Sequence, residues 1–80
     1  MQIKILGTGC PKCKALEKNV RDAVDEAGIQ AEIDKVTDIT KIMEYDILMT
    51  PGLVINGNVV LSGRLANKQQ LKDLLVQAGA

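Results

Sequence analysis

The stretch Gly7-Thr8-Gly9-Cys10-Pro11-Lys12-Cys13 constrains the fold more than any other part of the chain. It holds both cysteines, separated by two residues. An alternating apolar segment, Ile3 to Leu6, precedes it, and a helical pattern from Leu16 to Ala27 follows. At a helix N-terminus, unpaired N–H groups and the helix dipole favour a negative charge such as a thiolate. The sequence therefore predicts a strand, a loop, and a helix that begins at a pair of thiols able to close a small disulfide ring.

The two cysteines are expected to differ in their surroundings. Cys10 falls at the helix N-cap and should be exposed, whereas Cys13 lies one turn into the helix and should be shielded. Thiol–disulfide exchange needs an accessible attacking thiolate and a second thiol that displaces the product. We therefore predict that Cys10 attacks disulfides and Cys13 resolves the mixed disulfide. Lys12 adds a screened positive charge, and Pro11 fits the first helical turn, where its missing N–H has no partner to lose.

Other interpretations of the cysteine pair stay open at this point. Two reduced cysteines can serve as small apolar side chains, and two thiolates suit Cu(I), which makes a soft-metal carrier the alternative function. A binding module with a vestigial motif is a third possibility, and it predicts that Cys10→Ser leaves function intact. The chain has no histidine, which excludes His-based catalysis and zinc sites with histidine. We expect no metal and no cofactor other than the Cys10–Cys13 disulfide.

Size and charge narrow the class of protein. Eighty residues predict one domain, 1–80, and the formal net charge is zero. Nucleic-acid binding needs a basic excess or stacking rings, and Tyr45, which is expected mainly to pack and alternatively to touch substrate, is the sole aromatic residue. No apolar run reaches membrane length or follows a basic N-terminal segment. We therefore expect a cytoplasmic monomer without nucleic-acid or membrane partners, a compartment where a lone cysteine pair is typically catalytic or metal-binding.

The first half of the chain predicts a strand, a helix and a second strand. In the first strand, Ile3 and Ile5 alternate with Gln2 and Lys4. The helix carries an apolar stripe that comprises Leu16, Val20, Ala23, Val24 and Ala27, and Gly28 should end it. The second strand has an apolar face of Ile29, Ala31 and Ile33, and its polar face predicts an edge position. Because such a crossover is right-handed, the two strands should be parallel.

The second half predicts a short helix, a hairpin and a last helix. Thr37-Asp38 offers a cap for a helix that contains Ile39, Ile42 and Met43 and ends near Tyr45-Asp46. The runs Leu53 to Ile55 and Val59 to Leu61 flank Asn56-Gly57-Asn58, which predicts a hairpin. Asn67 should begin the last helix with Gln70 as its capping-box partner. The buried stripe of that helix is Leu71, Leu74, Leu75 and Ala78, and Gly79 should stop it.

Thr50-Pro51 stands just before the third predicted strand. A proline there is either an ordinary strand-start residue or part of a tight turn with a cis bond. Base rates for proline favour the trans form. The residues alone therefore leave the state of this bond open.

Together these motifs resemble the thioredoxin/glutaredoxin superfamily, above all its small single-domain redox-active disulfide proteins. The likeness rests on Cys10-Pro11-Lys12-Cys13 after the first strand, Thr50-Pro51 before the third and Gly63 after the fourth, and the element order extends it over essentially the whole chain. It implies an α/β thioredoxin-like fold, β-α-β-α-β-β-α, with a four-stranded mixed sheet in the order 2-1-3-4 and helices on both faces.

The resemblance also implies roles for single residues. Cys10 becomes the nucleophile and Cys13 the resolving thiol, while Pro51 is cis and packs against the pair. The Thr50 backbone pairs with an extended substrate, and Gly63 leaves room in the substrate groove, to which we also assign Thr8 and Gly9. We therefore predict a thiol–disulfide oxidoreductase that reduces protein disulfides and is itself reduced by an upstream reductase. The reducing direction follows from the reducing poise of the cytosol.

Overall fold

Seven elements follow one another in the predicted order in the computed structural model, which describes residues 1–47 and 49–79. They are β1 (Gln2–Leu6), α1 (Pro11–Ala27), β2 (Glu32–Val36), α2 (Ile39–Met43), β3 (Gly52–Ile55), β4 (Asn58–Ser62) and α3 (Lys68–Gln77). The sequence of strands and helices is therefore β-α-β-α-β-β-α, as the residue patterns predicted.

The four strands form one mixed sheet in the order β2-β1-β3-β4, which confirms the predicted topology. β1 pairs in parallel with β2 and antiparallel with β3, and β3 pairs antiparallel with β4. Because β1 is central, the loop that follows it lies between the last residue of β2, Val36, and the first residue of β3, Gly52. Both β2 and β4 lie at edges of the sheet.

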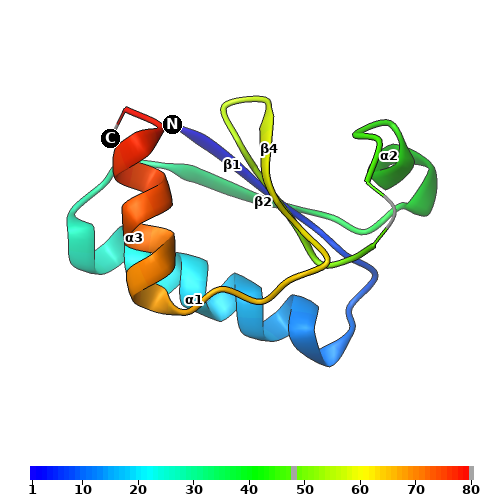
Figure 1. Ribbon diagram of the computed structural model, residues 1–80, viewed down its shortest axis with the longest axis horizontal. Coiled ribbons are helices and arrows are strands. Elements are labelled where there is room, and N and C mark those ends of the chain that lie inside the picture. The colour runs from blue at the N-terminus through cyan, green and yellow to red at the C-terminus, as the bar shows by residue number, and fades with distance from the viewer. Residues whose placement is uncertain (48, 80) are drawn as a thin grey trace.

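The pleat of β1 separates two apolar cores. Ile3 and Ile5 belong to the larger core under α1 and α3, whereas Leu6 belongs to a smaller core with Ile42 and Val54 on the opposite face. Figure 1 shows α1 and α3 against one face of the sheet and α2 near the end of the sheet away from the two termini. Helices therefore cover both faces, as predicted.

Capping residues lie at the ends of the helices where the sequence predicted them. Gly28 is the left-handed C-cap of α1, with φ of 66°. The Asp38 carboxylate accepts the Thr40 N–H at 2.9 Å, and Asn67 and Gln70 form a reciprocal capping box at the start of α3. In the hairpin, Asn56 and Gly57 both have positive φ, as a two-residue turn between twisted strands requires.

Some boundaries and burial differ from the sequence prediction. β2 begins at Glu32 rather than at Ile29, because the Ile29 N–H still donates to the Val24 carbonyl in the cap of α1. Ala27 is exposed, since the last turn of α1 extends past the core. In α2, Ile42 is buried but Ile39 and Met43 are exposed, because a helix of five residues has one side against the sheet. Within the described residues, no helix is long and apolar enough to cross a membrane.

Candidate active site

Cys10 is the N-cap of α1, the position that the sequence predicted for it. Its backbone is extended, with φ of −66° and ψ of 163°, and Pro11 occupies the first turn of the helix. The Cys10 sulfur accepts the Cys13 N–H at 3.1 Å, as an N-cap side chain does. The first turn of α1 contains no acidic residue, so no side chain there competes for the positive end of the helix dipole.

Cys13 forms a disulfide with Cys10, and their Cα atoms lie 5.0 Å apart. The Cys13 side chain belongs to the buried face of α1 and is 5% exposed, whereas Cys10 is half-buried at the surface. The predicted difference in exposure between the two cysteines is therefore present in the oxidised protein. A chain that reached this pair from solvent would meet Cys10 first.

Gly7 brings the end of β1 against the buried cysteine. A Cβ atom built on Gly7 would overlap the Cys13 sulfur and would lie 2.9 Å from the Cys13 Cβ. The Gly7 N–H donates to the Val36 carbonyl at 3.0 Å, which continues the pairing of β1 with β2 by one residue. Sequence interpretation placed Gly7 in a flexible loop and did not count it as a site residue, but its role is one of close packing.

The strand register fixes the position of Pro51 relative to Gly7. Gly52 is paired with Leu6, so the residue before Gly52 stands level with Gly7, which contacts Cys13. Pro51 is buried and the Thr50–Pro51 bond is cis, the state that the family resemblance implied and the residues alone left open. The Pro51 carbonyl accepts the Gly63 N–H at 2.8 Å.

Gly63 and Met49 meet next to this proline. Gly63 has φ of 72°, and a Cβ there would lie 2.7 Å from the Met49 Cβ. Met49 is nevertheless 64% exposed, so its flexible thioether forms part of the surface near Thr50. The sequence interpretation assigned Gly63 to the substrate groove but gave Met49 no role at the site, since a single apolar residue in a loop carries no periodic signal.

The other predicted site residues differ in their exposure to solvent. Thr8, Gly9 and Lys12 are exposed on the loop and first helical turn, and Thr50 is half-buried. Tyr45 packs against the core on the α2 side, and its hydroxyl lies 3.3 Å from the Lys4 ammonium. This position supports the packing role for Tyr45 over the substrate-contacting alternative.

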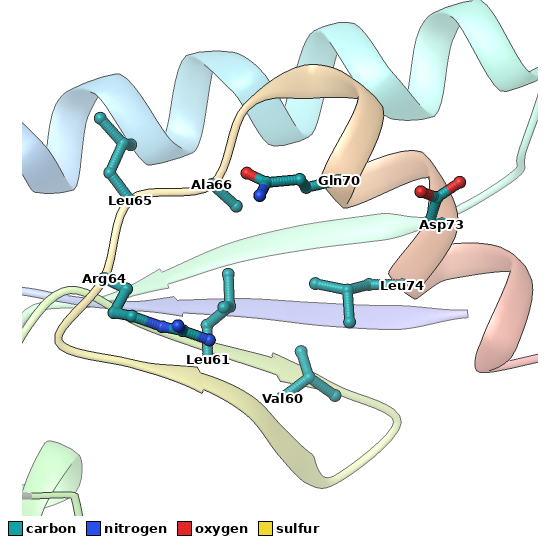
Figure 2. Close-up of a pocket in the computed structure, with 8 residues that line it drawn as sticks. All are labelled: Val60, Leu61, Arg64, Leu65, Ala66, Gln70, Asp73 and Leu74. Carbon is teal, nitrogen blue, oxygen red and sulfur yellow. The ribbon is translucent and has the colours of Figure 1, made fainter.

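A groove of about 340 Å³ lies between β4 and α3, and no cysteine lines it. Figure 2 shows Val60 and Leu61 from β4 and Leu74 from α3 around this groove, with Arg64 on the connecting loop. Arg64 directly follows Gly63, so the loop joins the groove to the region of Pro51. Sequence interpretation did not identify it, because the groove arises from the packing of two elements.

No group of three or more His, Cys, Asp or Glu side chains that could hold a metal ion occurs in residues 1–47 and 49–79.

Comparisons with known proteins agree with this geometry. Residues 1–76 match the family model described as a thioredoxin domain. The chain is 44% identical over 75 residues to a thioredoxin of Methanothermobacter thermautotrophicus, an alignment that covers 94% of this chain and 97% of that protein. It is also 44% identical over 73 residues to a thioredoxin of Methanocaldococcus jannaschii, covering 91% of this chain and 84% of that protein. A second thioredoxin of M. jannaschii is 32% identical over 72 residues.

A mixed sheet in this order, with a Cys-x-x-Cys pair at the N-terminus of the first helix, defines a thioredoxin-like thiol–disulfide oxidoreductase. The extent of these matches shows more than the class, and the chain belongs to the thioredoxin family. The predicted fold, family and enzymatic activity are thereby confirmed, and the soft-metal carrier is not favoured.

Proposed function

We propose that Cys10 is the attacking thiol and Cys13 the resolving thiol in the reduction of protein disulfides. The observation that carries this assignment is the difference between the two sulfurs. Cys10 is half-buried at the N-cap of α1, while Cys13 is 5% exposed and packed beneath Gly7. An intermolecular attack needs the accessible sulfur, and the internal second step can use the shielded one.

The proposed cycle has two exchange steps. The Cys10 thiolate attacks one sulfur of a substrate disulfide, a Cys10–substrate bond forms, and the other substrate sulfur leaves as a thiolate. Cys13 then attacks the Cys10 sulfur as a thiolate, which breaks the mixed disulfide and releases the second substrate thiolate. The substrate gains two electrons and the enzyme ends as the Cys10–Cys13 disulfide, which an upstream reductase returns to the dithiol.

The surroundings of the disulfide support a polypeptide substrate. Pro51 stands level with Gly7, which contacts Cys13, and the half-buried Thr50 precedes it. We assign the backbone of Thr50 to pairing with an extended substrate chain. We assign Thr8, Gly9 and Gly63 to the sides of the groove that would hold this substrate chain. Pro11 and Lys12 shape the helical turn that follows Cys10. The protein would act as a single-domain cytoplasmic monomer of residues 1–80, with no cofactor beyond its disulfide.

The test is to trap the mixed disulfide. A Cys13→Ser variant, reduced and mixed with a disulfide-bonded test protein, should accumulate a covalent complex. Mass spectrometry under non-reducing conditions should detect this complex, and dithiothreitol should reduce it to its two components. Cys10→Ser serves as the matched control and should form no such complex. The assignment fails if Cys10→Ser accumulates the complex and Cys13→Ser does not.

A further inference from the structure

The segments that meet at the disulfide end of the sheet carry charge of one sign. They are residues 7–14, 49–52 and 62–66, which the pairing of Gly52 with Leu6 and the hydrogen bond from Gly63 to Pro51 bring together. The chain as a whole has ten cationic and ten anionic residues, yet these segments contain no aspartate or glutamate. Their cations, all exposed, are Lys12, Lys14 and Arg64. Such a local excess attracts acidic partners even where the net charge of the chain is zero.

Arg64 also lines the groove between β4 and α3, whose volume is about 340 Å³. In Figure 2 the Arg64 side chain reaches from the connecting loop toward Leu61, and the floor of the groove is apolar. Val60 is an extra residue of β4, because its neighbours Val59 and Leu61 pair with successive residues of β3. Such a bulge can re-aim a side chain, and both Val60 and Leu61 line the groove. The groove therefore offers apolar area beside a guanidinium group.

A second hydrogen-bond donor lines the same groove. Gln70 lies there together with Arg64, and the Gln70 side-chain oxygen already accepts the Asn67 N–H at 2.9 Å. The remaining amide group of Gln70 and the guanidinium of Arg64 are both donors. Two donors beside an apolar floor suit a carboxylate that neighbours an apolar side chain. Asp73 of α3 also lines the groove, and its charge disfavours a second acidic residue there.

The groove continues the region that we assigned to the substrate. Arg64 directly follows Gly63, whose N–H donates to the Pro51 carbonyl at 2.8 Å. A strand rises about 3.3 Å per residue, so Val60 lies roughly 10 Å along the chain from Gly63. An extended substrate chain that pairs with Thr50 and passes Gly63 therefore reaches the groove with a residue about three positions farther along.

We propose that the groove between β4 and α3 is a substrate subsite, and that it binds an acidic residue next to an apolar residue in the protein whose disulfide is reduced. Arg64 binds the carboxylate and Val60 contacts the apolar side chain, which makes them specificity-determining residues. This inference rests on the proposed function, because the same substrate chain must present its disulfide to Cys10. It adds a substrate class, namely disulfides flanked by an acidic and an apolar residue.

The experiment compares synthetic peptides as substrates of the full, reduced protein. Each peptide has a fluorophore and one cysteine that is disulfide-bonded to a thiol carrying a quencher, so that reduction restores fluorescence. The pair Asp-Leu, Lys-Leu or Asp-Ala stands about three residues from the cysteine, on either side in separate peptides. On the side that reaches the groove, Asp-Leu should be reduced about two- to fivefold faster than Lys-Leu and about three- to tenfold faster than Asp-Ala. Salt at about 0.5 M should remove the first preference and leave the second.

Variants assign these preferences to the groove. Arg64→Gln should abolish the preference for Asp over Lys, and Arg64→Glu should reverse it. Arg21→Gln is the matched control, since it removes a guanidinium that contacts Glu17 on the side of α1 toward β2, at the opposite edge of the sheet from β4. Val60→Thr, which keeps the shape of the side chain, should weaken the preference for Leu over Ala. Val76→Thr, at an exposed valine of α3 outside the groove lining, should leave that preference unchanged.

The proposal is overturned if the parent protein reduces the three kinds of peptide at one rate, or if Arg64→Glu keeps the parent's preference. It is also overturned if Arg64→Glu changes the oligomeric state in sedimentation and leaves peptide selectivity unchanged, since the groove is then a contact between copies. Failure of the proposed function gives a different result, because no peptide is then reduced and Cys13→Ser traps no mixed disulfide.

Discussion

At the scale of single residues, the site depends on the absence of a side chain at Gly7. This residue is buried, it is not among the glycines with positive φ, and it lies directly against Cys13. The glycine is therefore required by the space between the end of β1 and the start of α1, not by backbone conformation. Its neighbour Gly9, in contrast, has φ of 95° and open space around it.

Gly7→Ala should therefore destabilise the protein through overpacking. The added methyl group would force Cys13 or the loop to move, which we expect to cost about 1–3 kcal/mol. Urea unfolding of the oxidised protein measures this loss. The matched control is Thr8→Ala at the exposed neighbouring position, for which the free energy of unfolding should stay within about 0.5 kcal/mol of the parent. Equal stability of the Gly7→Ala and Thr8→Ala proteins would contradict the packing argument.

The ion pair between Glu17 and Lys35 shows where prediction from the sequence ends. Cys10 and Cys13 could be identified because their spacing and the helix cap are local signals. Lys35 was visible only as a break in the alternation that Ile29, Ala31 and Ile33 begin. Its partnership with Glu17 depends on the register of β2 against β1 and on the rotation of α1, and neither is encoded within a short stretch of sequence.

At the scale of elements, α1 and α3 are joined by an ionic cluster outside the core. Glu26 near the end of α1 contacts Lys68 and Lys72 of α3, with 3.0 Å between the Glu26 Oε1 and the Lys72 Nζ. Hydrogen bonds from Lys68 first, and from Lys72, hold the pKa of Glu26 below its ordinary value of 4.5. The hydrogen bond to Glu26 raises the pKa of Lys68 above its ordinary value of 10.5.

This cluster predicts that the free energy of unfolding depends on pH in two ranges, an acidic limb set by Glu26 and an alkaline limb set by Lys68. The depressed pKa of Glu26 means that its contribution is present above pH 4.5 and is lost as pH falls through the lower folded value. The raised pKa of Lys68 means that its contribution is present below pH 10.5 and is lost as pH rises through the higher folded value.

Glu26→Gln should reduce both limbs in thermal unfolding measured from pH 2 to pH 11, and the effect should be small because the groups are exposed. Asp73→Asn, at an acid of α3 that hydrogen-bonds Gln69, is the matched control and should leave both limbs in place. Identical pH curves for Glu26→Gln and the parent would refute a role for the cluster.

The elements themselves were largely predictable because their signals are short-range. The capping box of Asn67 with Gln70, the stop at Gly28 and the turn at Asn56-Gly57 each depend on residues within four positions. The start of β2 was wrong because strand pairing begins only where β1 provides a partner, opposite Gln2. The side of α2 that meets the sheet, with Ile42 buried and Met43 exposed, is set by tertiary packing.

At the scale of the whole molecule, two cores share one sheet. The larger core lies under α1 and α3, and the smaller one contains Leu6, Ile42, Ile47 and Val54. Both depend on β1 and β3, which run through the centre of the sheet. We therefore expect residues 1–80 to unfold as one cooperative unit.

Tyr45 makes this expectation testable, because it is the sole aromatic residue and packs on the smaller core. Its fluorescence should report that core, while far-ultraviolet circular dichroism reports the helices of the larger one. The two urea transitions should coincide, and Leu71→Ala, which truncates a buried residue of α3, should shift both equally by about 2–5 kcal/mol. A fluorescence transition that precedes the dichroism transition would show that the α2 side unfolds on its own.

The central claim is that Cys10 and Cys13 exchange between dithiol and disulfide as a working pair. The measurement is a redox titration in buffers of graded potential, with free thiols alkylated and counted by mass. We predict a reversible two-electron transition between roughly −120 and −270 mV, the range known for thioredoxin-fold oxidoreductases in general rather than a value obtained from this geometry. Failure to form the Cys10–Cys13 disulfide at any potential would contradict the account.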